Sequence, residues 1–162
     1  MGAACARERP SFPPPAQRAR VDTPDPGQLL SFVNMNSRFA GEHIVRDIDP
    51  NPGEWRWAQA RPQLQFAVPA GAQLRFAAHL AIADATFKKT GPVTITCSIN
   101  GRRIGATTCP RAGAYHLAYD VPRRWLVQGS RAEVDLVADK LWVSPVDGVR
   151  LSFILVSAGF VP

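Results

Sequence analysis

Tryptophans and arginines near the predicted ends of strands are the side chains of this chain best suited to bind a ligand. Trp125 follows Arg123 and Arg124, and Trp142 lies in the turn-rich residues 140–148. An indole face can stack against the axial C–H groups of a sugar ring, and a guanidinium donates several hydrogen bonds in one plane. Loops at the ends of a rigid sandwich commonly carry binding sites. We therefore predict Arg123, Arg124, Trp125 and Trp142 as ligand-binding residues; the alternative is that the tryptophans close the ends of the core.

Three histidines, His43, His79 and His116, are the side chains best suited to proton transfer or metal binding. They lie far apart in the sequence, whereas metal sites usually include two ligands within a few residues of each other. His79 and His116 each fall on the polar face of a predicted strand, so they could be neighbours on one sheet. We interpret them as solvent-facing side chains and predict no metal site.

Paired carboxylates are the remaining candidates for catalysis, because a glycosidase needs two Asp or Glu side chains roughly 5–10 Å apart. Asp47 and Asp49 are close in sequence, but their surroundings are rich in Pro, Asn and Gly, and solvated turn residues explain them. A calcium site that also uses Asn51 is the alternative. The sequence has no G-x-S-x-G elbow, phosphate-binding glycine loop, zinc signature or dinucleotide fingerprint. We predict that the protein is not an enzyme and uses no cofactor.

The cysteines bear on the compartment of the protein. Cys97 and Cys109 are predicted to form a disulfide if the protein is exported, because disulfides persist in oxidising compartments. The register leaves this open: a two-residue turn at Asn100-Gly101 places Cys97 opposite Ile104 and requires Cys109 to bend back. The alternative is that Cys97, on the apolar side of its strand, is a small core residue.

The third cysteine, Cys5, ends a segment of small residues, Met1-Gly2-Ala3-Ala4-Cys5, that resembles the end of a bacterial lipoprotein signal. The resemblance implies that Cys5 is lipidated, with the charged and apolar parts of the signal upstream of Met1; an incidental cysteine is the alternative. Residues 6–28 are rich in proline and contain only Phe12 and Val21 as large apolar side chains, so they cannot bury enough surface to fold alone. We predict a disordered, Pro-rich tether over residues 1–28.

Beyond the tether the pattern is that of short strands separated by turns. Residues 73–82 alternate apolar and polar side chains, and residues 93–99 alternate apolar with small polar ones, as half-buried strands do. Asn100-Gly101 then supplies the two positive-φ residues of a type I′ hairpin turn. The sequence thus predicts an all-β domain over residues 29–162, an antiparallel β-sandwich of about eight strands. The predicted segments are strands at 29–33, 55–59, 62–68, 73–82, 93–99, 102–108, 114–119, 133–138 and 149–157, and a helical turn at 122–127.

Four stretches of sequence carry a resemblance to a known type of module. They are Ser98–Gly105 around the Asn-Gly turn, Tyr115-His116-Leu117 leading to Val121-Pro122, Leu126 to Gly129, and Asp147–Leu151 before the last strand. Together they resemble bacterial jelly-roll modules of the carbohydrate-binding-like type over roughly residues 55–160, with one extra residue between the Asp and Arg of the last stretch. The resemblance implies a jelly-roll sandwich that binds a carbohydrate without catalysing a reaction.

Length and charge exclude two further classes of protein, nucleic-acid-binding proteins and proteins that span a membrane with a helix. The chain has 162 residues, and 19 Lys and Arg against 13 Asp and Glu give a formal net charge of +6. Nucleic-acid-binding proteins concentrate basic residues in one tract or on one face. The longest basic runs here are pairs, so we interpret the charge as dispersed and predict no nucleic-acid partner. No apolar run approaches the roughly 20 residues of a membrane-spanning helix.

Together these features predict a non-catalytic binding module on a tether, in the bacterial cell envelope or outside the cell and anchored to a membrane by lipid at Cys5. A glycan or an envelope protein is the expected partner. The alternative is a structural or assembly subunit that makes protein contacts through its sheet edges. The sequence does not determine the oligomeric state.

Overall fold

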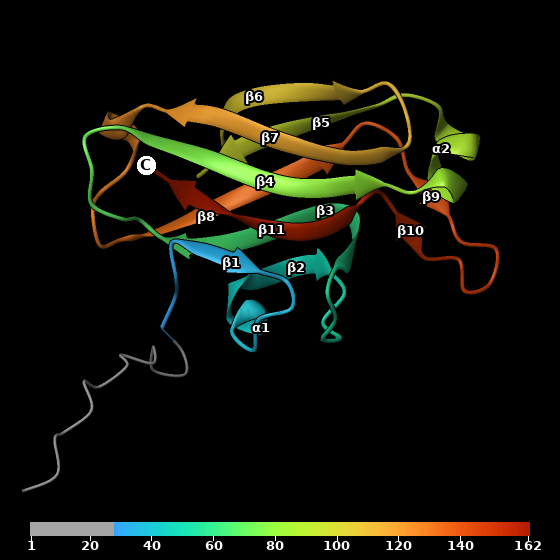
Figure 1. Ribbon diagram of the computed structural model, residues 1–162, viewed down its shortest axis with the longest axis horizontal. Helices are drawn as coiled ribbons and strands as arrows, with labels where there is room; N and C mark the ends of the chain where they lie inside the picture. The colour runs from blue at the N-terminus through green and yellow to red at the C-terminus, as the bar shows by residue number, and fades with distance from the viewer. Residues whose placement is uncertain (1–27) are drawn as a thin grey trace, which may run out of the picture.

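Two antiparallel sheets stacked face to face form the described part of the chain, residues 28–162, in the computed structural model (Figure 1). The strands are β1 (Phe32–Asn34), β2 (Ile44–Ile48), β3 (Arg56–Ala67), β4 (Leu74–Ile82), β5 (Val93–Ile99), β6 (Arg102–Cys109), β7 (Gly113–Val121), β8 (Arg131–Ala138), β9 (Trp142–Val143), β10 (Arg150–Leu151) and β11 (Ile154–Val161). The helical segments are α1 (Ala40–His43), α2 (Asp84–Thr90) and the 3₁₀ turn η1 (Arg123–Trp125). The predicted all-β sandwich is confirmed, with eleven strands in residues 28–162 in place of about eight.

The strand order explains how the two layers are held together. One sheet runs β1-β11-β4-β7, the other runs β2-β3-β8-β5-β6, and β9 and β10 form a separate ribbon. Strand β3 joins the layers, because Trp57 near its start pairs with Ile154 of β11, whereas residues 63–67 pair with β8. At the opposite edge Thr107 Oγ1 of β6 lies 2.6 Å from the Tyr119 hydroxyl of β7, which bridges the layers through side chains.

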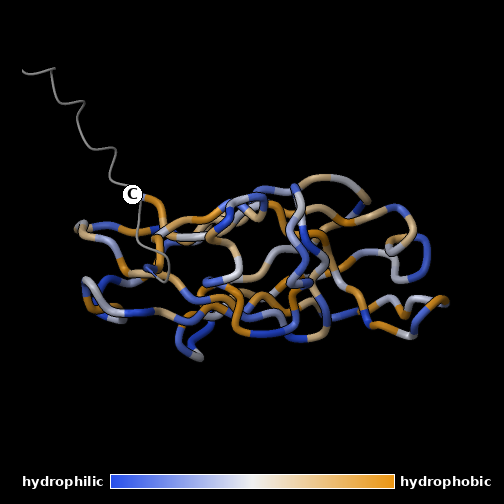
Figure 2. The backbone as a smooth tube through the Cα atoms, turned by 90° about the horizontal axis from the view of Figure 1, so that it is seen from below, coloured by the Kyte–Doolittle hydropathy of each residue, from blue (hydrophilic) through white to orange (hydrophobic). Residues whose placement is uncertain are grey.

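The core lies between the sheets and follows from the alternation of side chains along each strand. Figure 2 shows the two layers from the side, with hydrophobic and hydrophilic residues alternating along the chain. Phe66, Phe76 and Phe160 meet at the centre in edge-to-face pairs, with ring centroids 6.0 to 6.1 Å apart. Edge-to-face pairs are a favoured aromatic arrangement, so these three rings fix how the sheets pack.

The structure differs from the sequence prediction at several boundaries. The predicted strands 55–59 and 62–68 form the single strand β3, and the predicted strand 149–157 is divided between β10 and β11. Residues 34–54, for which the sequence predicts no strand or helix, contain α1 and β2. Strand β2 is hard to recognise because Asp47 within it has a positive φ of 55° and its register against β3 is irregular.

Helix α2 was also not predicted, although its ends carry recognisable signals. Asp84 lies in its first turn, Lys88 and Lys89 lie in its last turn, and Gly91 follows with a φ of 67°. These are ordinary helix start and stop signals. They frame only 7 residues, which is too short for a helical period to emerge from the sequence. The helical turn predicted at 122–127 is confirmed as η1.

The predicted disulfide between Cys97 and Cys109 is wrong for this structure, in which both thiols are free and buried. A bulge between Cys97 and Ser98 shifts the β5–β6 register, so that Cys97 lies opposite Gly105 and Cys109 lies opposite Val93. The two cysteines are therefore four residues apart along the hairpin, roughly 13 Å, whereas a disulfide needs Cα atoms within about 7 Å. Burial raises the pKa of both thiols, which makes them core residues of low reactivity.

The predictions for the N-terminal segment, a Pro-rich tether and lipidation of Cys5, lie outside the described residues. Within residues 28–162, none of the helices has the length and hydrophobicity that crossing a bilayer requires.

His43 is a structural residue in this fold. Its side chain is fully buried, its Nδ1–H donates to the Gln65 carbonyl at 2.7 Å, and its Nε2 accepts from the Leu30 amide at 3.3 Å. A carbonyl only accepts and an amide only donates, so these bonds select the neutral ring with its proton on Nδ1. Burial lowers the pKa of His43, against smaller opposing effects of the Gln65 carbonyl and Glu42.

We expect this histidine to make the fold less stable in acid. The pKa of His43 in the folded protein lies below its value of about 6.5 in the unfolded chain. The stabilisation by neutral His43 is therefore complete above about pH 6.5 and is lost as the pH falls through the folded pKa. The free energy of unfolding by urea should therefore decrease between about pH 7.5 and about pH 5.5. His43→Gln, which does not titrate, should show a smaller decrease; an equal decrease in the variant would contradict this role.

Candidate functional site

The structure separates the four residues predicted to bind a ligand. Arg123, Arg124 and Trp125 lie in η1, which follows the last residue of β7 at one end of the sandwich. Trp142 lies in β9, at the other end of the molecule (Figure 1). The predicted set therefore does not form one site but is divided between the two ends of the sandwich.

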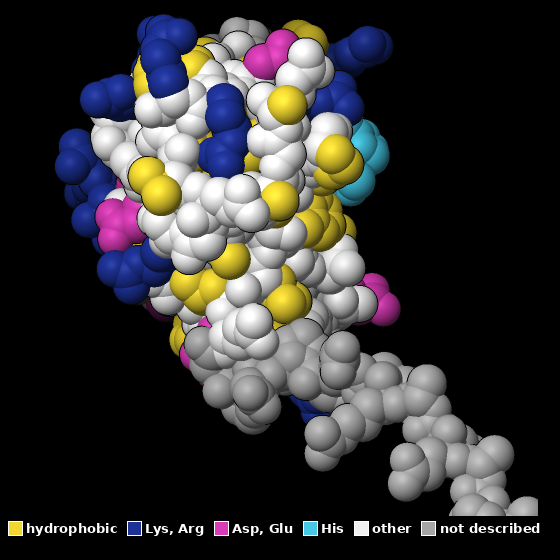
Figure 3. Space-filling view, turned by 90° about the vertical axis from the view of Figure 1, so that its left-hand side faces the viewer, with side chains coloured by type: hydrophobic (Ala, Val, Ile, Leu, Met, Phe, Trp, Pro, Cys, Tyr) yellow, Lys and Arg dark blue, Asp and Glu magenta, His cyan; other side chains and the backbone are white. Residues whose placement is uncertain are grey.

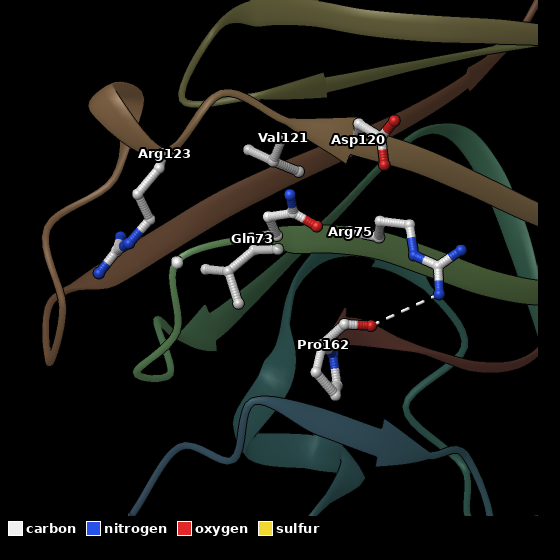
Figure 4. A pocket seen from close by; sticks show the side chains of 8 residues that line it. Gln73, Arg75, Asp120, Val121, Arg123 and Pro162 are labelled. Atoms are coloured by element: carbon white, nitrogen blue, oxygen red, sulfur yellow. Dashed lines mark hydrogen bonds between the residues drawn. The ribbon is translucent and has the colours of Figure 1, made fainter.

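The end that carries η1 has a hollow of about 530 Å³ between the start of β4 and the end of β7. Figure 4 shows its side chains: Arg75 lies across from Asp120 and donates a 3.4 Å hydrogen bond to the Pro162 carbonyl. Arg123 lines the same hollow, and its guanidinium is held by the carbonyls of Gly71 and Leu126, each at 3.0 Å. The side chain of Arg123, one of the two arginines predicted to bind a ligand, is thus fixed in place by the backbone.

This end also gathers six arginines, a local cluster that the prediction of a dispersed charge did not include. In Figure 3, which faces this end, Lys and Arg side chains crowd its upper part. They come from strand starts and from η1, which the hairpin registers bring together. The residues are Arg75, Arg102, Arg103, Arg123, Arg124 and Arg131. We call them the basic end.

Trp125 has one face covered within the basic end. The guanidinium carbon of Arg102 lies 5.4 Å from the centroid of its ring, a cation–π distance. The contact ties η1 to the β5–β6 hairpin and occupies part of the indole surface. The basic end therefore offers mainly guanidinium groups to a ligand, which suits an anionic group better than the face of a neutral sugar.

A second hollow, of about 350 Å³, lies at the other end of the sandwich where β2, β3 and β10 meet. Its lining combines an indole, two carboxylates and an amide with apolar side chains. The residues are Asp49, Pro50, Trp57, Gln59, Asp147, Val149 and Leu151. We call this hollow the Trp57 groove. Leu151, on its wall, pairs across the β9–β10 ribbon with Trp142, so one of the predicted binding residues is a neighbour of the groove.

The local fold explains why these side chains converge. Trp57 and Gln59 are two residues apart on β3, so both point to the same side of the strand. Ser152 fixes this segment, because its hydroxyl donates to the carbonyls of Ala58 at 3.1 Å and Gln59 at 2.8 Å. The Asp49 amide donates to the Trp57 carbonyl at 2.9 Å, which holds the chain after β2 against β3.

The aromatic side of the groove is a pair of tryptophans. Trp55 and Trp57 lie edge to face, with ring centroids 6.2 Å apart and ring planes at 88°. Trp55 is 48% exposed, which is high for a side chain of this size, and Trp57 is half-buried. Trp57 therefore has a supported ring that still borders the open groove.

The polar side of the groove is charged and largely prepared for a ligand. Hydrogen bonds from Ser144 and from the Val149 amide lower the pKa of Asp147, so it is ionised at neutral pH. Asp49 Oδ1 accepts from the backbone and side-chain nitrogens of Asn51. Within residues 28–162 no hydrogen bond engages Asp49 Oδ2 or the Gln59 side chain. These groups remain able to bond hydroxyl groups. No cluster of three or more metal-ligating side chains occurs in the same residues.

Arg56 supports the groove from inside the protein. It is 4% exposed, and its guanidinium donates to the carbonyls of Met35 at 3.2 Å, Asp49 at 3.3 Å and Pro50 at 2.8 Å. Burial lowers the pKa of Arg56, and the Asp49 carboxylate opposes that change. Arg56 thus uses its fork of donors to hold the segment that forms one wall of the groove.

We expect Arg56→Met to lower the free energy of unfolding by about 2–4 kcal/mol, because three carbonyls lose their donor inside the protein. The wall formed by Asp49 and Pro50 should also become less ordered. Arg61→Met, at an exposed position of the same strand, is the matched control and should change stability by no more than about 0.5 kcal/mol. Urea denaturation of both variants measures the difference, and equal stabilities would show that Arg56 does not hold this wall.

Sequence reasoning missed the Trp57 groove. It interpreted Trp55 and Trp57 as part of an alternating strand and Asp49 as a solvated turn residue. A useful signal was present, since two tryptophans flank a lone arginine just after a Pro-rich turn that contains a carboxylate. What the sequence did not show is that β10 and the Asp147 loop close the groove from about a hundred residues further along the chain.

Comparisons with known proteins gave matches to solved structures. No protein-family model matches the chain, and no curated protein matches it. Among solved structures, it is similar to the carbohydrate-binding module CBM35 of Abf62 from Cellvibrio japonicus, with a TM-score of 0.44, 20% identity, and coverage of 82% of this chain and 94% of that one. It is also similar to the C-terminal CBM6 of LamC, a marine laminarinase from Zobellia galactanivorans, with a TM-score of 0.40, 9% identity, and coverage of 79% and 98%.

A third similar structure is that of dimeric latent PorU from Porphyromonas gingivalis, with a TM-score of 0.35 and 16% identity. The match covers 60% of this chain but only 10% of PorU. Likenesses at these scores and identities assign neither a family nor a ligand to this chain.

Proposed function

We propose that this protein is a non-catalytic glycan-binding module and that the Trp57 groove is its binding site. The observation that carries the proposal is the convergence in one open hollow of an indole, two carboxylates and a free amide. A sugar presents C–H groups on one face and hydroxyls at its rim, so it needs this combination of an aromatic surface and hydrogen-bonding groups. The jelly-roll-like alternation of the sequence is consistent with the proposal.

Each lining residue has a role in this binding mode. The Trp57 ring stacks on a sugar face, while Asp49 and Asp147 accept hydrogen bonds from hydroxyl groups. Gln59 can both donate and accept, which allows it to bond a hydroxyl in either orientation. Sites that recognise hydroxyls by fixed partners reject ligands that lack them, because the buried polar groups are then left unpaired.

The basic end is the proposed second contact, and it retains Arg123, Arg124 and Trp125 as ligand-binding residues. Guanidinium groups bind carboxylates and sulfates through paired hydrogen bonds. The gathering of six arginines favours a glycan that carries acidic groups, with its anionic part reaching this end. Trp142 is proposed to contribute through its neighbour Leu151 at the rim of the Trp57 groove.

The location in the cell envelope or outside the cell, and lipidation at Cys5, also belong to this proposal. A glycan in the envelope or the medium is accessible only to an exported module. Expression of the gene with its upstream region in bacteria fed an alkyne-labelled fatty acid tests the anchor. Label that disappears in Cys5→Ser supports it, and an unlabelled wild-type protein contradicts it.

A glycan microarray that includes neutral and uronic-acid-containing polysaccharides tests the function. The wild-type protein should bind a defined set of glycans, and Arg123→Gln/Arg124→Gln should lose signal on the acidic members while keeping its binding to neutral ones. Incubation of the bound glycans with the protein should release no shorter products. No binding to any glycan would overturn the proposal, and release of products would contradict its non-catalytic part.

A further inference from the structure

The outer face of the sheet β1-β11-β4-β7 carries a pair of histidines that the glycan site does not use. His79 of β4 lies directly opposite His116 of β7 in the antiparallel register. Their ring centroids are 4.0 Å apart with an interplanar angle of 58°. His116 is exposed and His79 is half-buried, so both imidazoles lie on the open face of the sheet.

The surroundings of the pair are small and neutral. The neighbours along each strand on the same face are alanines: Ala77, Ala81, Ala114 and Ala118. Within residues 28–162 no hydrogen bond or ion pair engages either ring. On the other side of His79, Ser157 of β11 lies opposite it in the register. The two imidazoles thus lie within contact distance, and within residues 28–162 their nitrogens have no hydrogen-bond partner.

We propose that His79 and His116 together bind a divalent transition-metal ion, with the remaining coordination positions open to water or to a ligand from solution. Imidazole nitrogen is a preferred ligand of Zn²⁺, Ni²⁺ and Cu²⁺, and affinity for such a site is highest for Cu²⁺. The register of two adjacent strands fixes the spacing of the rings, so little conformational freedom is lost when an ion bridges them.

The protonation state of His79 is consistent with this role. Burial lowers the pKa of His79, and the neighbouring His116 lowers it further, since two positive imidazolium rings repel each other. A metal ligand must be the neutral ring. His79 is therefore already in the form that binds metal at neutral pH.

The flanking alanines define what the site can do. Their methyl groups supply no further ligands, and they leave space above the sheet for an exogenous ligand. An ion held by two histidines with open positions resembles a catalytic or docking site more than a structural site, which is normally closed by four protein ligands. The proposal does not depend on glycan binding, because the face and the groove share no residues.

Copper titration of the full chain tests the site. The measurements are isothermal calorimetry with Cu²⁺ and electron paramagnetic resonance of the bound ion, in a Cys5→Ser background that removes a competing thiol. We expect one ion per chain, a spectrum with two equivalent nitrogen ligands, and at least a tenfold loss of affinity in His116→Ala and again in His79→Gln. His43→Gln removes a histidine that is buried elsewhere and serves as the matched control, with no change expected.

The outcomes separate the alternatives. If either single variant binds copper less than tenfold more weakly than the wild type, the two rings do not act together. Equal affinity in the double variant would place copper elsewhere on the chain. Either result overturns the proposal. Circular dichroism of each variant verifies that the sheet is intact, and His116 is exposed, so its replacement leaves the fold unaffected.

Discussion

Trp57→Ala is expected to weaken glycan binding by roughly thirtyfold or more, because loss of a central aromatic side chain commonly costs about 2 kcal/mol or more of binding free energy. In the groove Trp57 is the one indole on the lining, and it is held by Trp55 on one side and by the β3 backbone below. The affinity of wild type and variant for the strongest ligand from the array, measured by isothermal calorimetry, gives the ratio of Kd values.

Two further variants show whether the aromatic face is what matters. Trp57→Phe keeps a flat ring and should lose less affinity than Trp57→Leu, which keeps apolar area but no aromatic face. All three variants should keep the wild-type melting temperature within a few degrees, since the hydrogen bonds that fix this segment use backbone atoms of β3. Equal affinity of Trp57→Phe and Trp57→Leu would show that stacking does not contribute.

Gly159→Ala is expected to lower the free energy of unfolding by about 3–5 kcal/mol. Gly159 lies in β11 with a φ of 151°, and a Cβ there would collide with the backbone of Ser31 and Phe32 in and beside β1. Backbone atoms cannot rotate away as a side chain would. The new methyl group therefore either separates β1 from β11 or forces a change of φ.

Gly113→Ala is the matched control for this prediction. Gly113 also has a positive φ, 129°, but a Cβ added there meets nothing within 4 Å. It should therefore show only the backbone cost, about 1–2 kcal/mol. Urea denaturation of both variants separates crowding from backbone strain. A difference between them of less than about 1 kcal/mol would contradict the close approach of β1 to β11.

The strands were predictable because burial imposes a period of two on them. Residues 73–82 and 93–99 alternate cleanly, and the structure makes them β4 and β5. The Asn100-Gly101 turn was also predictable, since both residues have the positive φ that a type I′ turn needs. The same alternation placed His79 and His116 on the polar faces of their strands, where the structure has them. In each case a local rule decides the outcome.

The site was not predictable, because it depends on where strands lie relative to one another. Trp57 borders a groove only because β3 passes from one sheet to the other near this residue and because the β9–β10 ribbon folds over it. The same limit explains why the sequence did not show that Trp125 and Trp142 lie at opposite ends of the sandwich. The disulfide is absent for a different reason: the β5–β6 hairpin pairs without a bend up to Cys109, so Cys97 and Cys109 stay four residues apart along it even though the bulge shifts the register by one residue.

The distribution of charge was also not predictable, because the composition does not show which charged side chains lie together in the fold. The sequence gives a net charge of +6 and short basic pairs, from which an even distribution was inferred. The structure gathers arginines from β4, β6, β8 and η1 at one end, while Asp49 and Asp147 lie in the groove at the other. Net charge alone therefore does not describe the field that a ligand meets.

The central claim is that the Trp57 groove binds a glycan, and an NMR titration tests it most directly. The measurement follows indole N–H and side-chain amide signals of ¹⁵N-labelled protein as the oligosaccharide from the array is added. The account predicts that the Trp57 indole and the Gln59 amide shift and saturate together, with the Kd measured by calorimetry. A saturated protein in which neither signal has moved would contradict it.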